Sequence, residues 1–339
     1  AGFRGKTAEE DSSIAKYIKT YNLAGVILYD IDLEIGGENL TPGTRNIESP
    51  SQVKALTSQL QNISKDTLLI SIDQEGGDSS RLKSIYGFKE DTSWANIGNL
   101  NSPILTEQFS ESMANTLFES GINLNFAPVL DLDYGEGTII STQRRAFSSN
   151  PDNIIKHARI FINAHKQKNI ITCAKHFPGL GSASGDTHEG LTDITDTWTV
   201  KDMIPFDKLI QNNDLDTVMV SHAFDKKLDP NYPSSLSQNI ITKMLRNDLG
   251  FEGIVICDDP SMRAISDHYN LEETFKLMLD AGIDLFCLGN NLIYDPDYIP
   301  KSINSVCSLI ESGKIKRTRI EQSIDKIKLL KSKYGIGKK

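Results

Sequence analysis

The sequence predicts a TIM-type (β/α)8 barrel in the α/β class, with residues 1–339 forming a single domain. Seven short apolar runs recur along the chain, and a helical pattern follows each of them. The starts of these runs lie 31 to 55 residues apart, which is the length of a βα unit with loop insertions. Each run is almost continuously apolar, as is typical of parallel strands that are buried on both faces.

The predicted strands follow one another without a linker or a break in composition. In chain order they are 25–30 (GVILYD), 67–73 (TLLISID), 122–131 (INLNFAPVLD), 171–177 (ITCAKHF), 216–222 (DTVMVSH), 253–259 (GIVICDD) and 284–289 (DLFCLG). Residues 1–5 read like the end of a strand whose apolar body is missing, and we expect them to supply the eighth strand. This suggests a removed leader peptide or a trimmed chain, and the sequence leaves both open. An open, doubly wound sheet is the alternative, but no G-x-G-x-x-G loop follows any strand.

Helix signals lie between the strands. In the segment 237–249 a serine precedes an apolar stripe, and Gly250 follows it as a stop signal. The segment 317–333 places isoleucines 320, 324 and 327 on one face. Both patterns predict amphipathic helices.

The composition excludes several classes of function. The net charge of −9 argues against a nucleic-acid partner, because a polyphosphate requires a basic patch. No apolar run reaches the roughly 18 residues of a transmembrane helix. The four cysteines form no C-x-x-C pair, and the three that lie inside apolar, strand-like runs read as buried hydrophobes, so the redox compartment stays open. We expect a monomer, and the sequence leaves its location open between the cytoplasm and an exported site.

Charged and polar residues stand where the predicted strands end. They are Asp73-Gln74-Glu75-Gly76-Gly77, Asp131, Lys175-His176, Ser221-His222, Asp258-Asp259 and Asn290. Helix capping explains one such residue, but six strand ends at once indicate a ring of functional groups at the catalytic end of a barrel. A charged cup without a glycine-rich phosphate loop suits a neutral, polyhydroxylated ligand. The six histidines show no H-x-H pair, so we expect neither a metal nor another cofactor.

Several motifs resemble one known family in the same order along the chain. The run Lys175-His176-Phe177-Pro178-Gly179-Leu180-Gly181, followed by Asp186-Thr187-His188, is similar to the signature loop of single-domain bacterial β-N-acetylglucosaminidases of glycoside hydrolase family 3. Those enzymes carry K-H-F-P-G-H-G, four residues, and then D-S/T-H. DQEGG at 73–77 with Arg81, NFAPVLD at 125–131, RAF at 145–147 and LGFEGIVICDDPSM at 249–262 also resemble the family. The similarity covers nearly the whole chain.

The resemblance implies roles for individual residues. Asp258 takes the place of the family's nucleophile, and His188 takes that of its general acid/base, oriented by Asp186. The sugar-binding positions of the family map onto Asp73, Arg81, Arg145, Lys175 and His176.

The chemistry of these residue types agrees with those roles. A retaining glycosidase needs one carboxylate to attack the anomeric carbon and one group to protonate the leaving oxygen. Imidazole titrates near neutral pH, so it can give a proton and take it back. Asp186, two residues before His188, can hold one ring nitrogen. A loop turn alone would also explain D-T-H, but the neighbouring Lys-His-Phe-Pro-Gly run favours the catalytic interpretation.

Two residues depart from the family pattern. Leu180 replaces the second histidine of G-H-G, and Asp78 stands where the acetylglucosaminidases usually have arginine. Both bear on the sugar preference rather than on the reaction. We expect Glu75 and Asp259 to be structural, because neighbours in a strand point away from the barrel axis and helix capping suffices for either. His222 is left undecided.

The sequence therefore predicts a retaining hydrolase that removes terminal β-linked N-acetylglucosamine, and we expect peptidoglycan fragments to be its substrates. The alternatives are a β-glucosidase or a glycoside phosphorylase of the same family, or a sugar-binding barrel with little turnover. The short segment after Gly289 disfavours the glucosidase, because family 3 β-glucosidases resemble longer chains in which a second domain supplies the acid/base. The intact Asp186, His188 and Asp258 disfavour the binding protein.

Overall fold

Seven strands pair side by side, all parallel, in the order in which they occur in the chain. The computed structural model describes residues 1–34 and 40–337. The strands are β1 (Gly25–Ile27), β2 (Leu69–Ile72), β3 (Leu124–Asn125), β4 (Ile171–Phe177), β5 (Thr217–Val220), β6 (Ile254–Cys257) and β7 (Leu285–Phe286). Each lies inside one of the predicted apolar runs, so all seven predictions are confirmed.

The predicted eighth strand forms only in part. Ala1 accepts a hydrogen bond from the amide of Ile27 (3.1 Å), and the amide of Gly2 donates to Leu288 (2.7 Å). The N-terminal residues therefore lie between β1 and the end of β7, with a single parallel bridge between Gly2 and Ile27. The described residues show a curled, seven-stranded sheet, and a fully closed eight-stranded barrel stays a prediction, as does the single domain.

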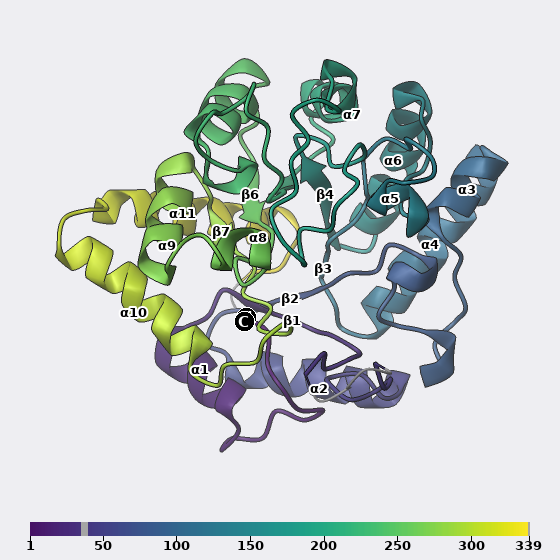
Figure 1. The fold of residues 1–339 in the computed structure, drawn as a ribbon. Helices are drawn as coiled ribbons and strands as arrows, with labels where there is room; N and C mark the ends of the chain where they lie inside the picture. Colours follow the sequence, from purple (N-terminus) through teal and green to yellow (C-terminus); the bar gives the residue numbers. More distant parts are fainter. Residues whose placement is uncertain (35–39, 338–339) are drawn as a thin grey trace.

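Helices surround the sheet on its outer side (Figure 1). They are α1 (Ser13–Tyr21), α2 (Pro50–Ile63), α3 (Trp94–Leu100), α4 (Pro103–Glu119), α5 (Ile139–Thr142), α6 (Pro151–Lys166), α7 (Val200–Gln211), η4 (Asn239–Asp248), α8 (Arg263–Ser266), α9 (Leu271–Ala281), α10 (Tyr298–Glu311) and α11 (Arg317–Lys333), with short turns η1 (Gly77–Ser79), η2 (Ser84–Tyr86) and η3 (Ser234–Leu236). The helices α2, α4 and α6 each begin with a Ser or Asn cap followed by proline at the first position, a pairing that satisfies the free amides and presets φ.

The two helices predicted from sequence are present. Helix α11 has the predicted bounds. In the segment 237–249 the chain forms η4, a wide helix, and the Ser237 hydroxyl accepts the amide of Ile240 at 3.1 Å. Gly250, at φ 72°, ends it.

Alternate strand residues point to two different cores. One face of the sheet packs against the helices, as Ile70, Val218 and Val255 do. The other face fills the inside of the curl, where Leu69, Phe126, Met219 and Ile256 meet. This alternation explains why the strands read as continuously apolar.

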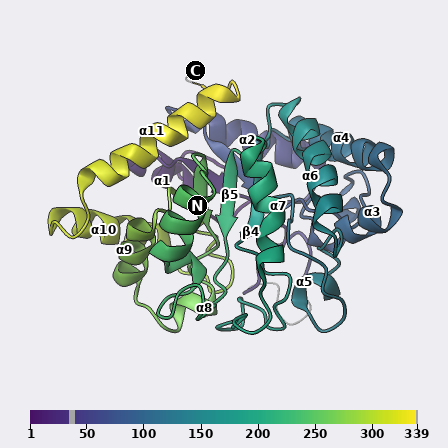
Figure 2. The ribbon, with the colours of Figure 1, turned by 90° about the horizontal axis from the view of Figure 1, so that it is seen from above.

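Helix α11 covers the N-terminal ends of the strands. Leu330, Tyr334 and Ile336 pack into the inner core, and Lys331 donates to the carbonyls of Ala24 (3.1 Å) and Thr67 (2.7 Å). Figure 2 shows α11 along one edge of the molecule and the short helices α5 and α8 at the opposite edge. The C-terminal strand ends therefore remain open for a site.

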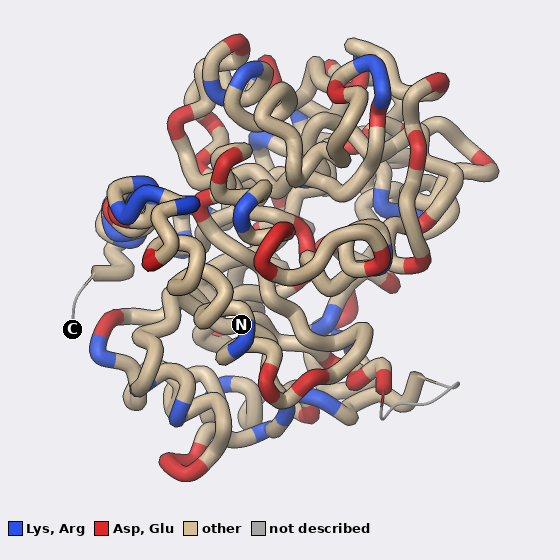
Figure 3. Tube along the Cα trace, turned by 60° about the vertical axis from the view of Figure 1, so that its left-hand side comes forward, with Lys and Arg blue, Asp and Glu red and all other residues tan. Residues whose placement is uncertain are grey.

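Charged residues of both signs are interspersed along the trace (Figure 3). No described helix is both long and apolar enough to cross a membrane.

Candidate active site

A single pocket of about 440 Å³ opens at the C-terminal ends of the strands and contains all eight residues predicted for the site. They are Asp73, Arg81, Arg145, Lys175, His176, Asp186, His188 and Asp258. The floor is apolar and consists of Ile27, Phe126, Met219 and Cys287 from the inner core. The pocket is therefore a cup with charged walls and a closed, apolar base.

The loop after β2 carries the first wall. Its glycines are required by close contacts: a Cβ on Gly76 would lie 2.3 Å from the Thr92 carbonyl oxygen, and one on Gly77 would lie 2.9 Å from the Ser93 backbone. Both glycines also have positive φ, at 113° and 60°. Between them and the strand, Gln74 turns away from the pocket and accepts the amides of residues 81 and 82.

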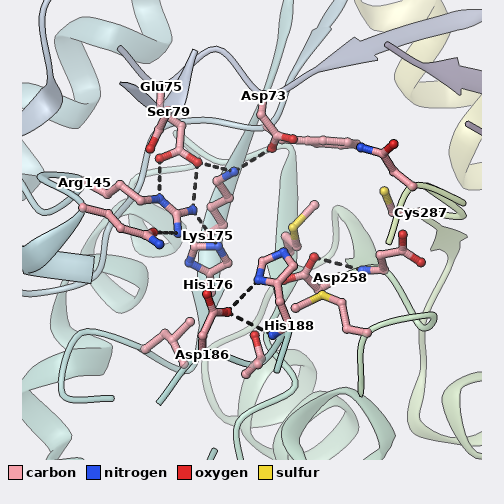
Figure 4. A pocket seen from close by; sticks show the side chains of 18 of the residues that line it. Asp73, Glu75, Ser79, Arg145, Lys175, His176, Asp186, His188, Asp258 and Cys287 are labelled. Atoms are coloured by element: carbon pink, nitrogen blue, oxygen red, sulfur yellow. Dashed lines mark hydrogen bonds and ion pairs between the residues drawn. The ribbon is translucent and has the colours of Figure 1, made fainter. Parts of the chain in front are cut away.

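Asp73 and Glu75, on either side of Gln74, both point to the ammonium of Lys175 (Figure 4). The Lys175 ammonium lies 2.8 Å from Asp73 Oδ1 and 2.6 Å from Glu75 Oε1. Arg145 donates from Nε and Nη2 to the two oxygens of Glu75, each at 2.8 Å. Burial would raise the pKa of Glu75, but Arg145 and Lys175 outweigh it and hold that pKa far below its usual range. Both carboxylates are thus ionised and fixed.

Arg81 extends the same network. Its Nη2 lies 3.5 Å from Asp73 Oδ2, and its Nη1 lies 3.9 Å from the buried carboxylate of Asp30. Burial alone would lower the pKa of Arg81, but these two carboxylates raise it. The guanidinium keeps its charge and stays at the pocket wall, 30% exposed.

Asp131 orients the imidazole of His176. Its Nδ1 lies 2.6 Å from Asp131 Oδ2, while Asp131 Oδ1 accepts the amide of Leu180 at 2.7 Å. Arg145 Nη2 lies 3.3 Å from His176 Nε2. Because an arginine can only donate, Nε2 accepts and the ring proton sits on Nδ1, facing Asp131. The sequence reasoning placed Asp131 at a strand end but gave it no role, and the structure shows that it orients His176.

Asp258 follows β6 and is anchored by backbone contacts. Its amide donates to Val220 (3.2 Å), and its Oδ1 accepts the amide of Asp259 (2.9 Å). Burial would raise the pKa of Asp258, but neighbouring groups, among them His188 and the amide of Asp259, outweigh it and lower that pKa. The carboxylate is therefore ionised in the pocket near neutral pH, in the form that a nucleophile requires.

Asp186 and His188 form a pair on the loop after β4. Asp186 Oδ1 lies 2.6 Å from His188 Nδ1 and also accepts the His188 amide at 2.9 Å. In Figure 4 the imidazole lies between the carboxylates of Asp186 and Asp258. Burial opposes the charged ring, but Asp186 and Asp258 outweigh it and raise the pKa of His188. The hydrogen bond from His188 lowers the pKa of Asp186.

The structure corrects the expectation for Glu75 and refines that for Asp259. Glu75 caps no helix; it lines the pocket and pairs with Arg145 and Lys175. The reason is geometric: Glu75 lies two residues after Asp73, so alternation places both on the same side. Asp259 does cap a turn, accepting the amide of Ser261 at 3.0 Å, but it lines the pocket as well.

The two residues that depart from the family pattern also line the pocket. Leu180 is buried in the core, and Asp78 is exposed in η1. Among the described residues, no group of three His, Cys, Asp or Glu side chains has the arrangement of a metal site.

Sequence comparison gives an independent view of the chain. The model of the Glycosyl hydrolase family 3 N terminal domain matches residues 6–330. A β-hexosaminidase of Hydrogenovibrio crunogenus is 32% identical over 309 residues, which are 88% of this chain and 79% of that protein. A β-hexosaminidase of Photobacterium profundum is 35% identical over 252 residues, which are 73% of each chain.

Solved structures agree with the sequence comparison. The family 3 β-N-acetylglucosaminidase of Paenibacillus sp. str. FPU-7 has a TM-score of 0.88 at 27% identity, over 99% of this chain and 61% of that one. The β-N-acetylglucosaminidase of Thermotoga maritima has a TM-score of 0.78 at 27% identity, over 99% of this chain and 66% of that one. This chain thus spans less than two thirds of either solved chain. The family resemblance is confirmed over residues 6–330, and the chain belongs to glycosyl hydrolase family 3, a family of glycosidases.

Proposed function

We propose that this protein removes a terminal β-linked N-acetylglucosamine from glycosides, with retention of configuration. One observation carries the proposal: an ionised, half-buried Asp258 and an Asp186–His188 pair face each other across one pocket. Relatives named β-hexosaminidase and β-N-acetylglucosaminidase support the choice of sugar.

The shape of the pocket supports action at a chain end. Its base is closed by the apolar side chains of Ile27, Phe126, Met219 and Cys287, so a polysaccharide cannot pass through. A volume of about 440 Å³ accommodates a terminal sugar and the start of its leaving group.

The proposed reaction has two displacements. In the first, an Asp258 oxygen bonds to the anomeric carbon as the glycosidic bond breaks, and His188 gives its proton to the departing oxygen. In the second, His188 takes a proton from water, the water oxygen bonds to the anomeric carbon, and Asp258 leaves. Asp186 holds His188 Nδ1 throughout and stabilises the imidazolium, which is present before the first displacement and again after the second.

We propose that the charged wall holds the sugar hydroxyls. Asp73, Arg81, Arg145, Lys175 and His176 present donors and acceptors that already pair with one another. Such a preorganised set needs no rearrangement when a neutral sugar replaces water. Fragments of peptidoglycan are the proposed natural substrates, and the reaction as written needs no metal or organic cofactor.

A paired assay tests the proposal. Purified protein is given the nitrophenyl β-glycosides of N-acetylglucosamine and of glucose, and the anomer first released is identified by NMR. Faster release of β-N-acetylglucosamine supports the proposal. Preference for the glucoside would favour a β-glucosidase, a sugar phosphate formed in phosphate buffer would indicate a phosphorylase, and binding without turnover would leave a sugar-binding protein.

A further inference from the structure

We propose that His222, together with Ser235, is a positioning residue that fixes the backbone at Asp258 and Asp259 and thereby aims the nucleophile. This inference rests on the proposed function, because it takes Asp258 as the attacking group.

His222 cannot reach the substrate. It is fully buried behind the end of β5, and it does not line the pocket. Both of its ring nitrogens have protein partners: Nδ1 lies 2.7 Å from the Ser235 hydroxyl, and Nε2 lies 3.0 Å from the Asp259 carbonyl oxygen. A direct role in proton transfer to the sugar is therefore excluded by position.

The hydrogen-bond directions define a single arrangement for the neutral ring. A carbonyl oxygen only accepts, so Nε2 carries the proton and donates it to Asp259. Nδ1 then accepts from the Ser235 hydroxyl, which is itself fully buried. Burial lowers the pKa of His222, which favours this neutral form.

The His222 imidazole fixes Asp259, and Asp259 in turn orients the carboxylate of Asp258. Asp259 is fixed at its carbonyl by His222 (3.0 Å) and at its side chain by the Ser261 amide (3.0 Å). Its own amide donates to Asp258 Oδ1 at 2.9 Å. Asp258 is tied in turn to Val220, two residues before His222. The end of β5 therefore bonds to two successive residues, Asp258 through Val220 and Asp259 through His222.

Loss of the His222 contact leaves the Asp259 carbonyl with the amide of Met262 (3.0 Å) as its remaining partner. The less constrained carbonyl allows rotation about Asp259, which moves the amide that orients Asp258. A misplacement of about 1 Å at a reacting group costs on the order of 100-fold in rate. Binding of the sugar depends on the opposite wall and should change little. The signature of positioning is therefore a slower first chemical step at nearly constant affinity.

The test compares three variants with the wild-type protein. His222→Leu removes both ring contacts, whereas His222→Gln keeps an N–H donor near the position of Nε2. His157→Leu is the matched control, because His157 is equally buried and bonded through both nitrogens, to Thr106 (2.7 Å) and Asn101 (2.9 Å), away from the pocket. The burst of dinitrophenolate from dinitrophenyl N-acetyl-β-glucosaminide measures formation of the glycosyl-enzyme, and titration with N-acetylglucosamine measures affinity.

We expect His222→Leu to slow the burst about 10- to 100-fold with affinity changed less than about twofold, and we expect His222→Gln to recover most of the rate. His157→Leu should lower the melting temperature but keep the burst rate. A wild-type burst rate in His222→Leu, or an equal loss in His157→Leu, would overturn the inference. If His222→Leu does not fold, Ser235→Ala replaces it, with an expected loss of about two- to fivefold, and an unchanged rate there overturns the inference. A wild-type protein that forms no glycosyl-enzyme on Asp258 would instead overturn the proposed function.

Discussion

Replacing Glu75 with glutamine removes one negative charge from the centre of the pocket at nearly constant volume. In the native protein the Glu75 carboxylate receives Arg145 through two hydrogen bonds of 2.8 Å and Lys175 at 2.6 Å. The side chains of Glu75, Lys175 and Arg145 are 4%, 3% and 15% exposed. The amide offers one oxygen in place of two and turns an N–H group toward a cation.

The cost can be bounded from these contacts. Neutralising one partner of a buried ion pair costs about 3–5 kcal/mol, because the remaining charge lacks a counter-ion. Lys175 keeps Asp73 at 2.8 Å and Arg145 is partly exposed, so we expect the lower end, about 3 kcal/mol. For a chain of this length that corresponds to a fall of about 4 °C in Tm.

The same contacts predict a dependence on pH. The folded-state pKa of Glu75 lies below its unfolded value, since Arg145 and Lys175 outweigh burial. The stability contributed by the carboxylate is therefore fully present above the unfolded pKa of about 4.3 and is lost as pH falls toward the folded pKa. The Tm of Glu75→Gln should lie about 4 °C below that of the wild type at pH 7, and this difference should shrink below about pH 4.

Thermal unfolding by calorimetry and titration with N-acetylglucosamine measure the two effects together. Glu111→Gln, at an exposed site on α4, is the control for the change in net charge. Equal Tm values for both variants at pH 7, with unchanged sugar affinity, would refute the role of Glu75 as the counter-ion of the pocket.

The remaining predictions concern the proposed chemical groups. Asp258→Asn should lower kcat by several orders of magnitude on an activated aryl glycoside while Asp259→Asn costs far less, and near wild-type turnover of Asp258→Asn would end its assignment as nucleophile. His188→Ala should lose more activity on poor leaving groups than on nitrophenyl glycosides, and azide should rescue it with formation of a β-glycosyl azide; equal loss on both substrates without rescue would limit His188 to a structural role. Asp186→Asn removes a contact that raises the pKa of His188, so the basic limb of kcat/KM should move to lower pH, and an unmoved limb would contradict the pairing. Arg145→Ala should weaken sugar binding by about 1–3 kcal/mol in a calorimetric titration, and unchanged affinity would place the sugar elsewhere.

The strands could be predicted from sequence because burial on both faces leaves a continuous apolar signal. The ends of β3 and β7 show the limit of that signal. Each run extends beyond its continuous strand, which is Leu124–Asn125 in one and Leu285–Phe286 in the other. In the first run a separate bridge joins Val129 to Lys175. Pairing depends on the neighbouring strand, which no local pattern contains. The same limit applies to residues 1–5. Their contacts are with Ile27 in β1 and Leu288 after β7, and these two strands are the opposite edges of the sheet.

The residues of the site could be predicted because strand ends and family motifs coincide, but their partners could not. Asp131 and His222 were visible at strand ends, yet their roles depend on contacts with His176 and Asp259, 45 and 37 residues away. Glu75 was misplaced because it was treated as a strand neighbour that points away from the barrel axis, although it lies two residues after Asp73. Counting by two residues from Asp73 would have placed it in the pocket.

The position of α11 separates thermal stability from catalytic turnover, two properties that often compete in enzymes. Its contacts with the inner core and with the carbonyls of Ala24 and Thr67 lie at the end of the sheet opposite the pocket. Leu330, Tyr334 and Ile336 do not line the pocket, so we expect improved packing beneath α11 to leave the loops around His188 unchanged. In directed evolution, heat tolerance could therefore be gained around Leu330 and Tyr334 without the usual sacrifice of turnover.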